Sequence, residues 1–170
     1  MPSAAIRSMF GVHIFLLPDP HAMLPKGIWN TITSMRLWIS RLLILIVTAW
    51  NLQAALLFIA SPGTVAGDYK LSGAAGAAAI RGVGVLFLMW NIPFLIAVLH
   101  PRRYRVALVS ALLMQLTGLI GESYILSTLT MEHALLRASI QRFILFDGIG
   151  LVLLFTAWRL AAGTASSSGC

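Results

Sequence analysis

The chain has 170 residues, of which 59% are hydrophobic and 10% are charged. A soluble domain carries about 25% charged residues, so the composition excludes that class and predicts a protein that lies in lipid. The net charge of +7 does not indicate nucleic-acid binding, because the basic residues gather at the ends of apolar segments.

Residues 1–35 are predicted to form an N-terminal arm at the membrane interface. The apolar run at residues 10–17 is far shorter than the ~20 residues that a membrane span needs. Pro18, Pro20 and Pro25 interrupt a helix here, and no small-residue cleavage site indicates a secretory signal.

Four apolar segments of bilayer length follow the arm, and they predict an all-α, polytopic bundle of four transmembrane helices. The Ser61-Pro62-Gly63 sequence ends the first segment, and Pro93 is expected to kink the second. The membrane domain is predicted at 36–162, with spans at about 38–60, 73–99, 106–126 and 141–160, and a polar tail is predicted at 163–170.

The distribution of basic residues predicts the orientation of these spans. One side of the bilayer would carry Arg7, Lys26, Arg36, Arg41, Arg102, Arg103, Arg105 and Arg159, and the other Lys70, Arg81, Arg137 and Arg142. Basic residues are retained in the cytoplasm, so both termini are expected there. Arg102, Arg103 and Arg105 in the loop between spans two and three are expected to set the topology and to contact lipid headgroups.

An intramembrane polar cluster is predicted from four charged residues at neighbouring depths: Arg81, Glu122, Asp147 and Arg142. At 1.5 Å rise per residue, Arg81 lies roughly 13 Å, Glu122 roughly 8 Å and Asp147 roughly 5 Å from the middle of their spans. Charges in hydrocarbon are expected to face inward and pair. An ion-pair network that fixes helix packing is the favoured interpretation. The alternative is a polar pocket that serves as a proton relay or binds a quinone or lipid headgroup.

A Trp-Asn dipeptide occurs near the middle of both of the first two spans, as Trp50-Asn51 and Trp90-Asn91. Asparagine amides form hydrogen bonds between membrane helices, so Asn51 and Asn91 are expected to support packing. Contact with a cofactor or substrate is the alternative. Asn91 also lies close enough to Pro93 to bond backbone groups at the expected kink.

No catalytic or nucleotide-binding motif is present, and no metal site or cofactor is predicted beyond contact with lipid or quinone. The single cysteine, Cys170, excludes an intrachain disulfide. A non-catalytic role in the membrane is therefore expected.

Residues from about 36 to 160 resemble the DoxX-like class of small four-helix bacterial membrane proteins. The resemblance rests on the four short spans, the Ala79-Ile80-Arg81-Gly82 end of a Gly-rich stretch, the Pro-Arg-Arg loop and Glu122. It implies the bacterial inner membrane and an accessory role.

The leading hypothesis is an accessory subunit of a larger electron-transfer complex, respiratory (such as alternative complex III) or photosynthetic. It would be held there by contacts with lipids and other integral membrane subunits. The alternative is a small transporter or quinone-interacting redox protein that uses Arg81, Glu122 and Asp147.

Overall fold

The structure is a computed structural model and describes residues 26–162. The chain divides into two units, residues 1–32 and 33–170. In the first unit, residues 26–32 are helical, and Thr31 Oγ1 donates a hydrogen bond to the Gly27 carbonyl at 3.1 Å. Of the predicted arm, residues 1–25 lie outside the described residues, and residues 26–35 belong to a helix. The predicted tail at 163–170 also lies outside the described residues.

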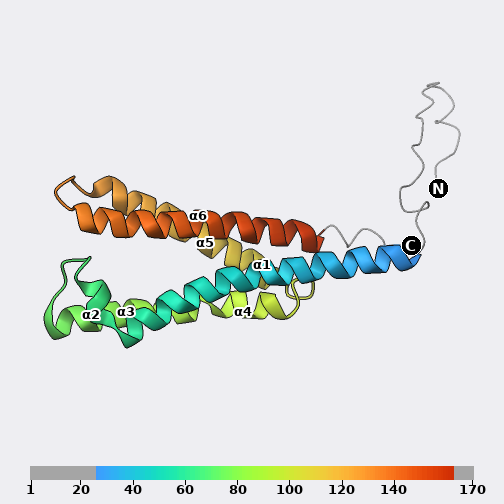
Figure 1. Cartoon of the computed structure of the whole chain (residues 1–170), viewed down its shortest axis with the longest axis horizontal. Coiled ribbons are helices and arrows are strands. Elements are labelled where there is room, and N and C mark those ends of the chain that lie inside the picture. Colours follow the sequence, from blue (N-terminus) through green and yellow to red (C-terminus); the bar gives the residue numbers. More distant parts are fainter. Residues whose placement is uncertain (1–25, 163–170) are drawn as a thin grey trace, which may run out of the picture. The chain divides into compact units, whose positions relative to one another are not determined.

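Six helices make up the described part of the chain, which contains no strand (Figure 1). They are α1 (Lys26–Ala60), α2 (Pro62–Ala66), α3 (Gly73–Trp90), α4 (Ile92–Leu99), α5 (Arg105–Thr128) and α6 (Ala134–Ala162). Within residues 26–162, four segments are long and apolar enough to cross a membrane, with α3 and α4 counting as one. The prediction of an all-α protein with four membrane-spanning helices is confirmed.

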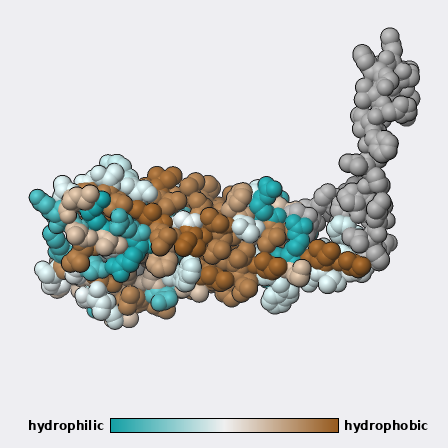
Figure 2. Space-filling model, turned by 45° about the horizontal axis from the view of Figure 1, so that its top comes forward, coloured by the Kyte–Doolittle hydropathy of each residue, from teal (hydrophilic) through white to brown (hydrophobic). Residues whose placement is uncertain are grey.

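The surface of the bundle is apolar along the spans. Large side chains such as Leu86, Leu113 and Val152 are more than half exposed. Figure 2 shows a brown, hydrophobic band between two groups of hydrophilic residues on the face in view. Such a band contacts membrane lipid, because only hydrocarbon tolerates so much exposed apolar surface.

The second span is broken where the sequence predicts a kink. Helix α3 ends at Trp90, and α4 begins at Ile92 with Pro93 in its first turn. Proline lacks the N–H that would continue the helical ladder. Asn91 Nδ2 donates to the Phe87 carbonyl at 2.7 Å, so the amide bonds the backbone at the break, as expected. Because Phe87 and Asn91 belong to the same span, this hydrogen bond does not join two neighbouring spans.

The half of the bundle near the connection at 100–104, here called the α4–α5 half, is tightly packed. Its core contains eight buried side chains from four helices, α1, α4, α5 and α6: Ile44, Val47, Phe94, Ala97, Leu108, Ala111, Leu154 and Ala157. Ser40 Oγ donates to the Ala157 carbonyl at 2.9 Å, which ties α1 to α6. This half holds the four spans together.

In the opposite half, called the α2 half, glycines bring the helices together in two pairs. A Cβ at Gly84 of α3 would lie 2.8 Å from Ile59 Cγ1 and 2.9 Å from the Ala55 carbonyl oxygen of α1. Nearer the middle of the bundle, a Cβ at Gly150 of α6 would lie 2.6 Å from Gln115 Nε2 of α5. Helix α1 therefore packs closely on α3, and α5 on α6, as small residues allow in membranes.

Candidate functional site

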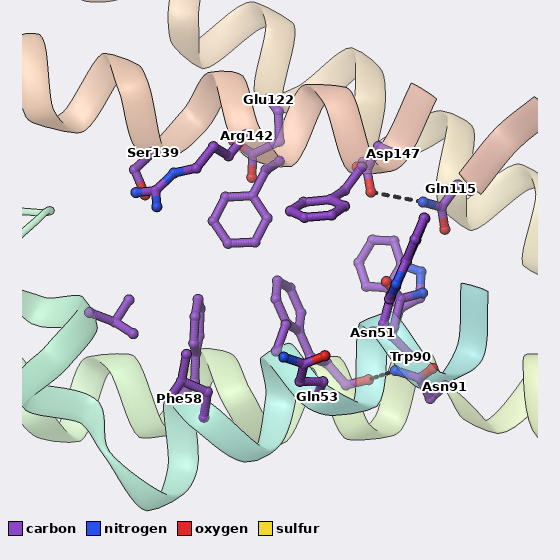
Figure 3. A pocket seen from close by; sticks show the side chains of 18 of the residues that line it. Asn51, Gln53, Phe58, Trp90, Asn91, Gln115, Glu122, Ser139, Arg142 and Asp147 are labelled. Atoms are coloured by element: carbon purple, nitrogen blue, oxygen red, sulfur yellow. Dashed lines mark hydrogen bonds between the residues drawn. The ribbon is translucent and has the colours of Figure 1, made fainter. Parts of the chain in front are cut away.

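A cavity of about 590 Å³ separates the α1/α3 pair from the α5/α6 pair in the α2 half (Figure 3). Small-molecule pockets commonly enclose ~300–1,000 Å³. The wall is mainly apolar and aromatic, with a few polar groups. It is formed by Val47, Trp50, Asn51, Gln53, Ala54, Leu57, Phe58, Thr64, Val65, Asp68, Phe87, Trp90, Asn91, Met114, Gln115, Gly118, Glu122, Ser139, Arg142, Phe143, Phe146 and Asp147.

Asp147 is held in position by α5. Gln115 Nε2 donates to Asp147 Oδ1 at 2.9 Å, and Gln115 is buried. Both residues face a glycine on the opposite helix: a Cβ at Gly118 would collide with Asp147 Oδ2, and a Cβ at Gly150 would collide with Gln115. The two glycines therefore make room for a polar pair between α5 and α6.

Glu122 lines the same cavity two helical turns along α5 from Gln115. Within the described residues it forms no hydrogen bond or ion pair, although it is partly buried. Figure 3 shows that Glu122 and Asp147 both approach the cavity from the α5/α6 side. The cavity therefore has two carboxyl groups on one wall.

The ion pair in the structure differs from the expected network. Arg142 Nη2 donates to Asp68 Oδ2 at 3.1 Å, and Asp68 lies in the connection between α2 and α3. Arg142 thus pairs with neither intramembrane acid. Arg81 does not line the cavity; its Nε donates to the Ile59 carbonyl at 3.4 Å. The structure brings Glu122, Asp147 and Arg142 to one cavity and leaves Arg81 outside it.

The residues of both Trp-Asn dipeptides line the cavity from the α1/α3 side (Figure 3). Asn91 is almost fully buried, and its Oδ1 has no hydrogen-bond partner within the described residues. Its NH₂ group is the one that donates to the Phe87 carbonyl, which fixes the oxygen as the unpaired atom. A buried acceptor without a partner costs free energy unless a ligand or water satisfies it.

Aromatic rings bridge the two helix pairs across the cavity. Phe58 of α1, Phe87 of α3 and Phe143 of α6 form a cluster with centroid distances of 5.5–6.3 Å. Trp50 of α1 contacts Phe146 of α6 edge-on at 5.6 Å. These ring contacts join the α1/α3 pair to the α5/α6 pair, and the same rings line the cavity.

Three consecutive residues between α2 and α3 reach over to α6 and the connection before it. Asp68 pairs with Arg142, Lys70 Nζ donates to His133 Nδ1 at 3.1 Å, and Tyr69 hydrogen-bonds Ser139. Burial raises the pKa of the Tyr69 phenol, and the bond to Ser139 partly offsets that rise. Because Asp68, Ser139 and Arg142 line the cavity, this segment closes its end in the α2 half.

Replacing Arg142 with glutamine is expected to change stability by less than ~1 kcal/mol, because exposed ion pairs contribute little. The Arg142 and Asp68 side chains are 64% and 37% exposed. Unfolding of the purified protein in detergent, followed by circular dichroism, measures the effect. A loss of several kcal/mol would mean that this pair holds the α2 half together.

The remaining predicted site residues lie away from the cavity. Arg102, Arg103 and Arg105 sit at the connection at 100–104 and the start of α5. The guanidinium of Arg105 lies 5.7 Å from the centre of the Trp158 ring. None of the three lines the cavity, so their predicted role in topology and lipid contact stays separate from it.

Sequence reasoning missed Gln115, Asp68 and the aromatic walls. A signal for Gln115 was present: residues 115, 118 and 122 recur at helical spacing on one face of α5, as do 143, 147 and 150 on α6. Asp68 lies in a connection, where no periodicity reveals which way it turns.

Among the described residues, no group of three or more His, Cys, Asp and Glu side chains could hold a metal ion. Comparisons with protein-family models, with curated proteins and with solved structures give no match.

Proposed function

We propose that this chain is a multi-pass membrane protein that binds a small lipophilic molecule in the cavity between its two helix pairs. The observation that carries the proposal is a cavity of about 590 Å³ at membrane depth in which polar groups converge on an aromatic wall. Pockets that bind small molecules combine an apolar wall with a few placed polar groups. A protein that needed only to pack its helices would fill this space with side chains.

The polar groups of the cavity support binding over a purely structural role. Asp147 and Gln115 satisfy each other, but Glu122 and the Asn91 oxygen have no partner within the described residues. Intramembrane ionisable groups mark substrate sites by default, because they are costly to keep in hydrocarbon. The cavity therefore favours the transporter or quinone-binding alternative over the ion-pair network.

Membership of a larger respiratory or photosynthetic complex, location in a bacterial inner membrane and resemblance to the DoxX-like class stay predictions. They are compatible with a binding role, since a subunit that holds a lipophilic ligand can serve such a complex. Co-purification from native membranes with intact-mass analysis tests complex membership. A protein recovered without stoichiometric partners would contradict it.

Filling the cavity is expected to abolish binding without unfolding the protein. Ala54 lines the cavity from α1, and a phenylalanine there would occupy its volume. Decylubiquinone and tetraphenylphosphonium serve as a neutral and a cationic probe, and quenching of the tryptophans reports binding, since Trp50 and Trp90 line the cavity. We expect saturable quenching by one or both probes in the original protein and none in Ala54→Phe.

The matched control is Ala78→Phe, on an exposed position of α3 outside the cavity, which should bind like the original protein. Thermal unfolding of both variants shows that each is folded. Equal saturable quenching in the Ala54→Phe and Ala78→Phe variants would place the binding elsewhere. If neither probe gives saturable quenching of the original protein, the proposed function is wrong.

A further inference from the structure

The charges that line the cavity do not balance. Asp68, Glu122 and Asp147 are acidic, and Arg142 is the one basic residue in the wall. Arg142 is already paired with Asp68 at 3.1 Å. Two carboxyl groups, on α5 and α6, therefore remain without a basic partner in the wall.

Other basic side chains of the α2 half are engaged elsewhere. Arg81 turns to the Ile59 carbonyl, and Lys70 donates to His133. Arg137 Nη1 donates to the Leu129 carbonyl at 2.6 Å, where it caps the end of α5. A carboxyl group in an apolar interior is neutralised by a proton or by a cation. Within the described residues, the protein places no cation of its own beside these two.

The aromatic walls suit the same kind of charge. Trp50, Trp90 and four phenylalanines line the cavity together with the two carboxyl groups. The face of an aromatic ring attracts a cation within about 6 Å of its centroid, and tryptophan attracts it most strongly. Aromatic walls also bind the apolar body of a ligand, so they fit a cation with a hydrophobic or aromatic body.

The polar atoms of the cavity that lack a hydrogen-bond partner are acceptors. Asn91 Oδ1 is a buried acceptor without a partner, and ionised carboxylates are acceptors only. An ammonium or amidinium group brings N–H donors to such atoms. The carbonyl oxygens of a quinone are acceptors themselves and leave the Asn91 oxygen unmatched.

We infer that the cavity selects a lipophilic organic cation, bound by Glu122 and Asp147 and enclosed by the aromatic walls. The inference rests on the proposed binding function and adds the charge class of the ligand. The cation would take the place of the proton or counter-ion that otherwise neutralises the two carboxyl groups.

The charge class is tested with two probes of nearly the same shape and opposite charge, tetraphenylphosphonium and tetraphenylborate. Calorimetric titration of the detergent-purified full chain, with empty micelles as the blank, gives the affinity for each. We expect saturable binding of the phosphonium at least about tenfold tighter than that of the borate, since opposite charges in contact attract by more than a tenfold ratio requires in surroundings less polar than water.

Glu122→Gln and Asp147→Asn should each weaken phosphonium binding by about tenfold or more, and the double variant should weaken it further. Both amides keep the shape of the original side chain, and the asparagine oxygen still accepts the Gln115 hydrogen bond. Glu132→Gln is the matched control, because Glu132 is exposed in the connection between α5 and α6 and lies outside the cavity. That variant should bind within about twofold of the original protein.

Decylubiquinone separates failure of this inference from failure of the proposed function. If the quinone binds in a manner blocked by Ala54→Phe while the phosphonium does not, the cavity binds ligands and the charge class is wrong. Equal affinities for phosphonium and borate, or unchanged phosphonium binding in the double variant, would also overturn the inference. If none of the three probes shows saturable binding, both proposals fall.

Discussion

Replacing Gly84 with alanine is expected to destabilise the protein by about 1–3 kcal/mol, the usual cost of overpacking a tight contact. The new Cβ would lie 2.9 Å from the Ala55 carbonyl oxygen and 3.0 Å from Phe58 Cβ. The carbonyl oxygen is backbone, so relief requires α1 to move away from α3. Such a shift would also displace Phe58, which lines the cavity, and it should therefore weaken ligand binding.

Gly82→Ala is the control, because a Cβ at Gly82 meets nothing within 4 Å. Alanine favours a helix more than glycine does, so this variant should be as stable as the original protein or slightly more so. The free energy of unfolding is measured in mixed micelles by raising the mole fraction of a denaturing detergent. Equal stability of the Gly84→Ala and Gly82→Ala variants would show that α1 and α3 are not in contact at this point.

The fold was largely predictable, because a membrane span is a run of about 20 apolar residues that can be recognised in the sequence alone. The expected spans at 73–99 and 106–126 agree closely with α3–α4 and α5. Helix α1 begins at Lys26, well before the expected 38, and α6 begins at Ala134, before the expected 141. Apolarity marks where a segment lies in lipid, whereas a helix continues past the membrane as long as its backbone bonds are satisfied.

The candidate site was predictable by depth but not by direction. Rise per residue placed Arg81, Glu122 and Asp147 at neighbouring depths, yet it carries no information on how each helix is rotated about its axis. Rotation is decided by packing, here by close contacts at Gly84, Gly118 and Gly150. These contacts turn the two acids toward the cavity and leave Arg81 outside it.

The partner of Arg142 illustrates a second limit. Its pairing with Asp68 joins residues 74 positions apart, through a connection whose path no periodic pattern encodes. The same holds for the pair of Lys70 and His133. The excess of acidic over basic groups in the cavity therefore becomes visible only in the structure, which shows the partners of these basic residues.

The orientation in the membrane yields an all-or-none prediction. Single cysteines at Lys70 and Arg103, introduced after Cys170→Ser removes the native thiol, should react with a membrane-impermeant maleimide from opposite sides. Both positions are exposed, and one membrane-spanning segment, α3–α4, separates them. In intact cells we expect labelling of the Lys70→Cys variant alone. The Arg103→Cys variant should react only after the membrane is opened.

The physical basis is the charge of the short connections. The connection at 100–104 carries two arginines, followed by Arg105 at the start of α5, and it contains no acid. The connections at the other end, 61–72 and 129–133, carry Asp68 and Glu132 as well as Lys70. Basic residues in short loops resist translocation, so the arginine connection should stay in the cytoplasm. Labelling of both cysteines from one side would contradict the four-span bundle itself, whereas exchange of the two sides would overturn only the charge argument.

An orientation with the arginines in the cytoplasm places the α2 end of the cavity, with Asp68 and Arg142, toward the opposite face. A cationic ligand would then meet Glu122 and Asp147 from that face or from the lipid.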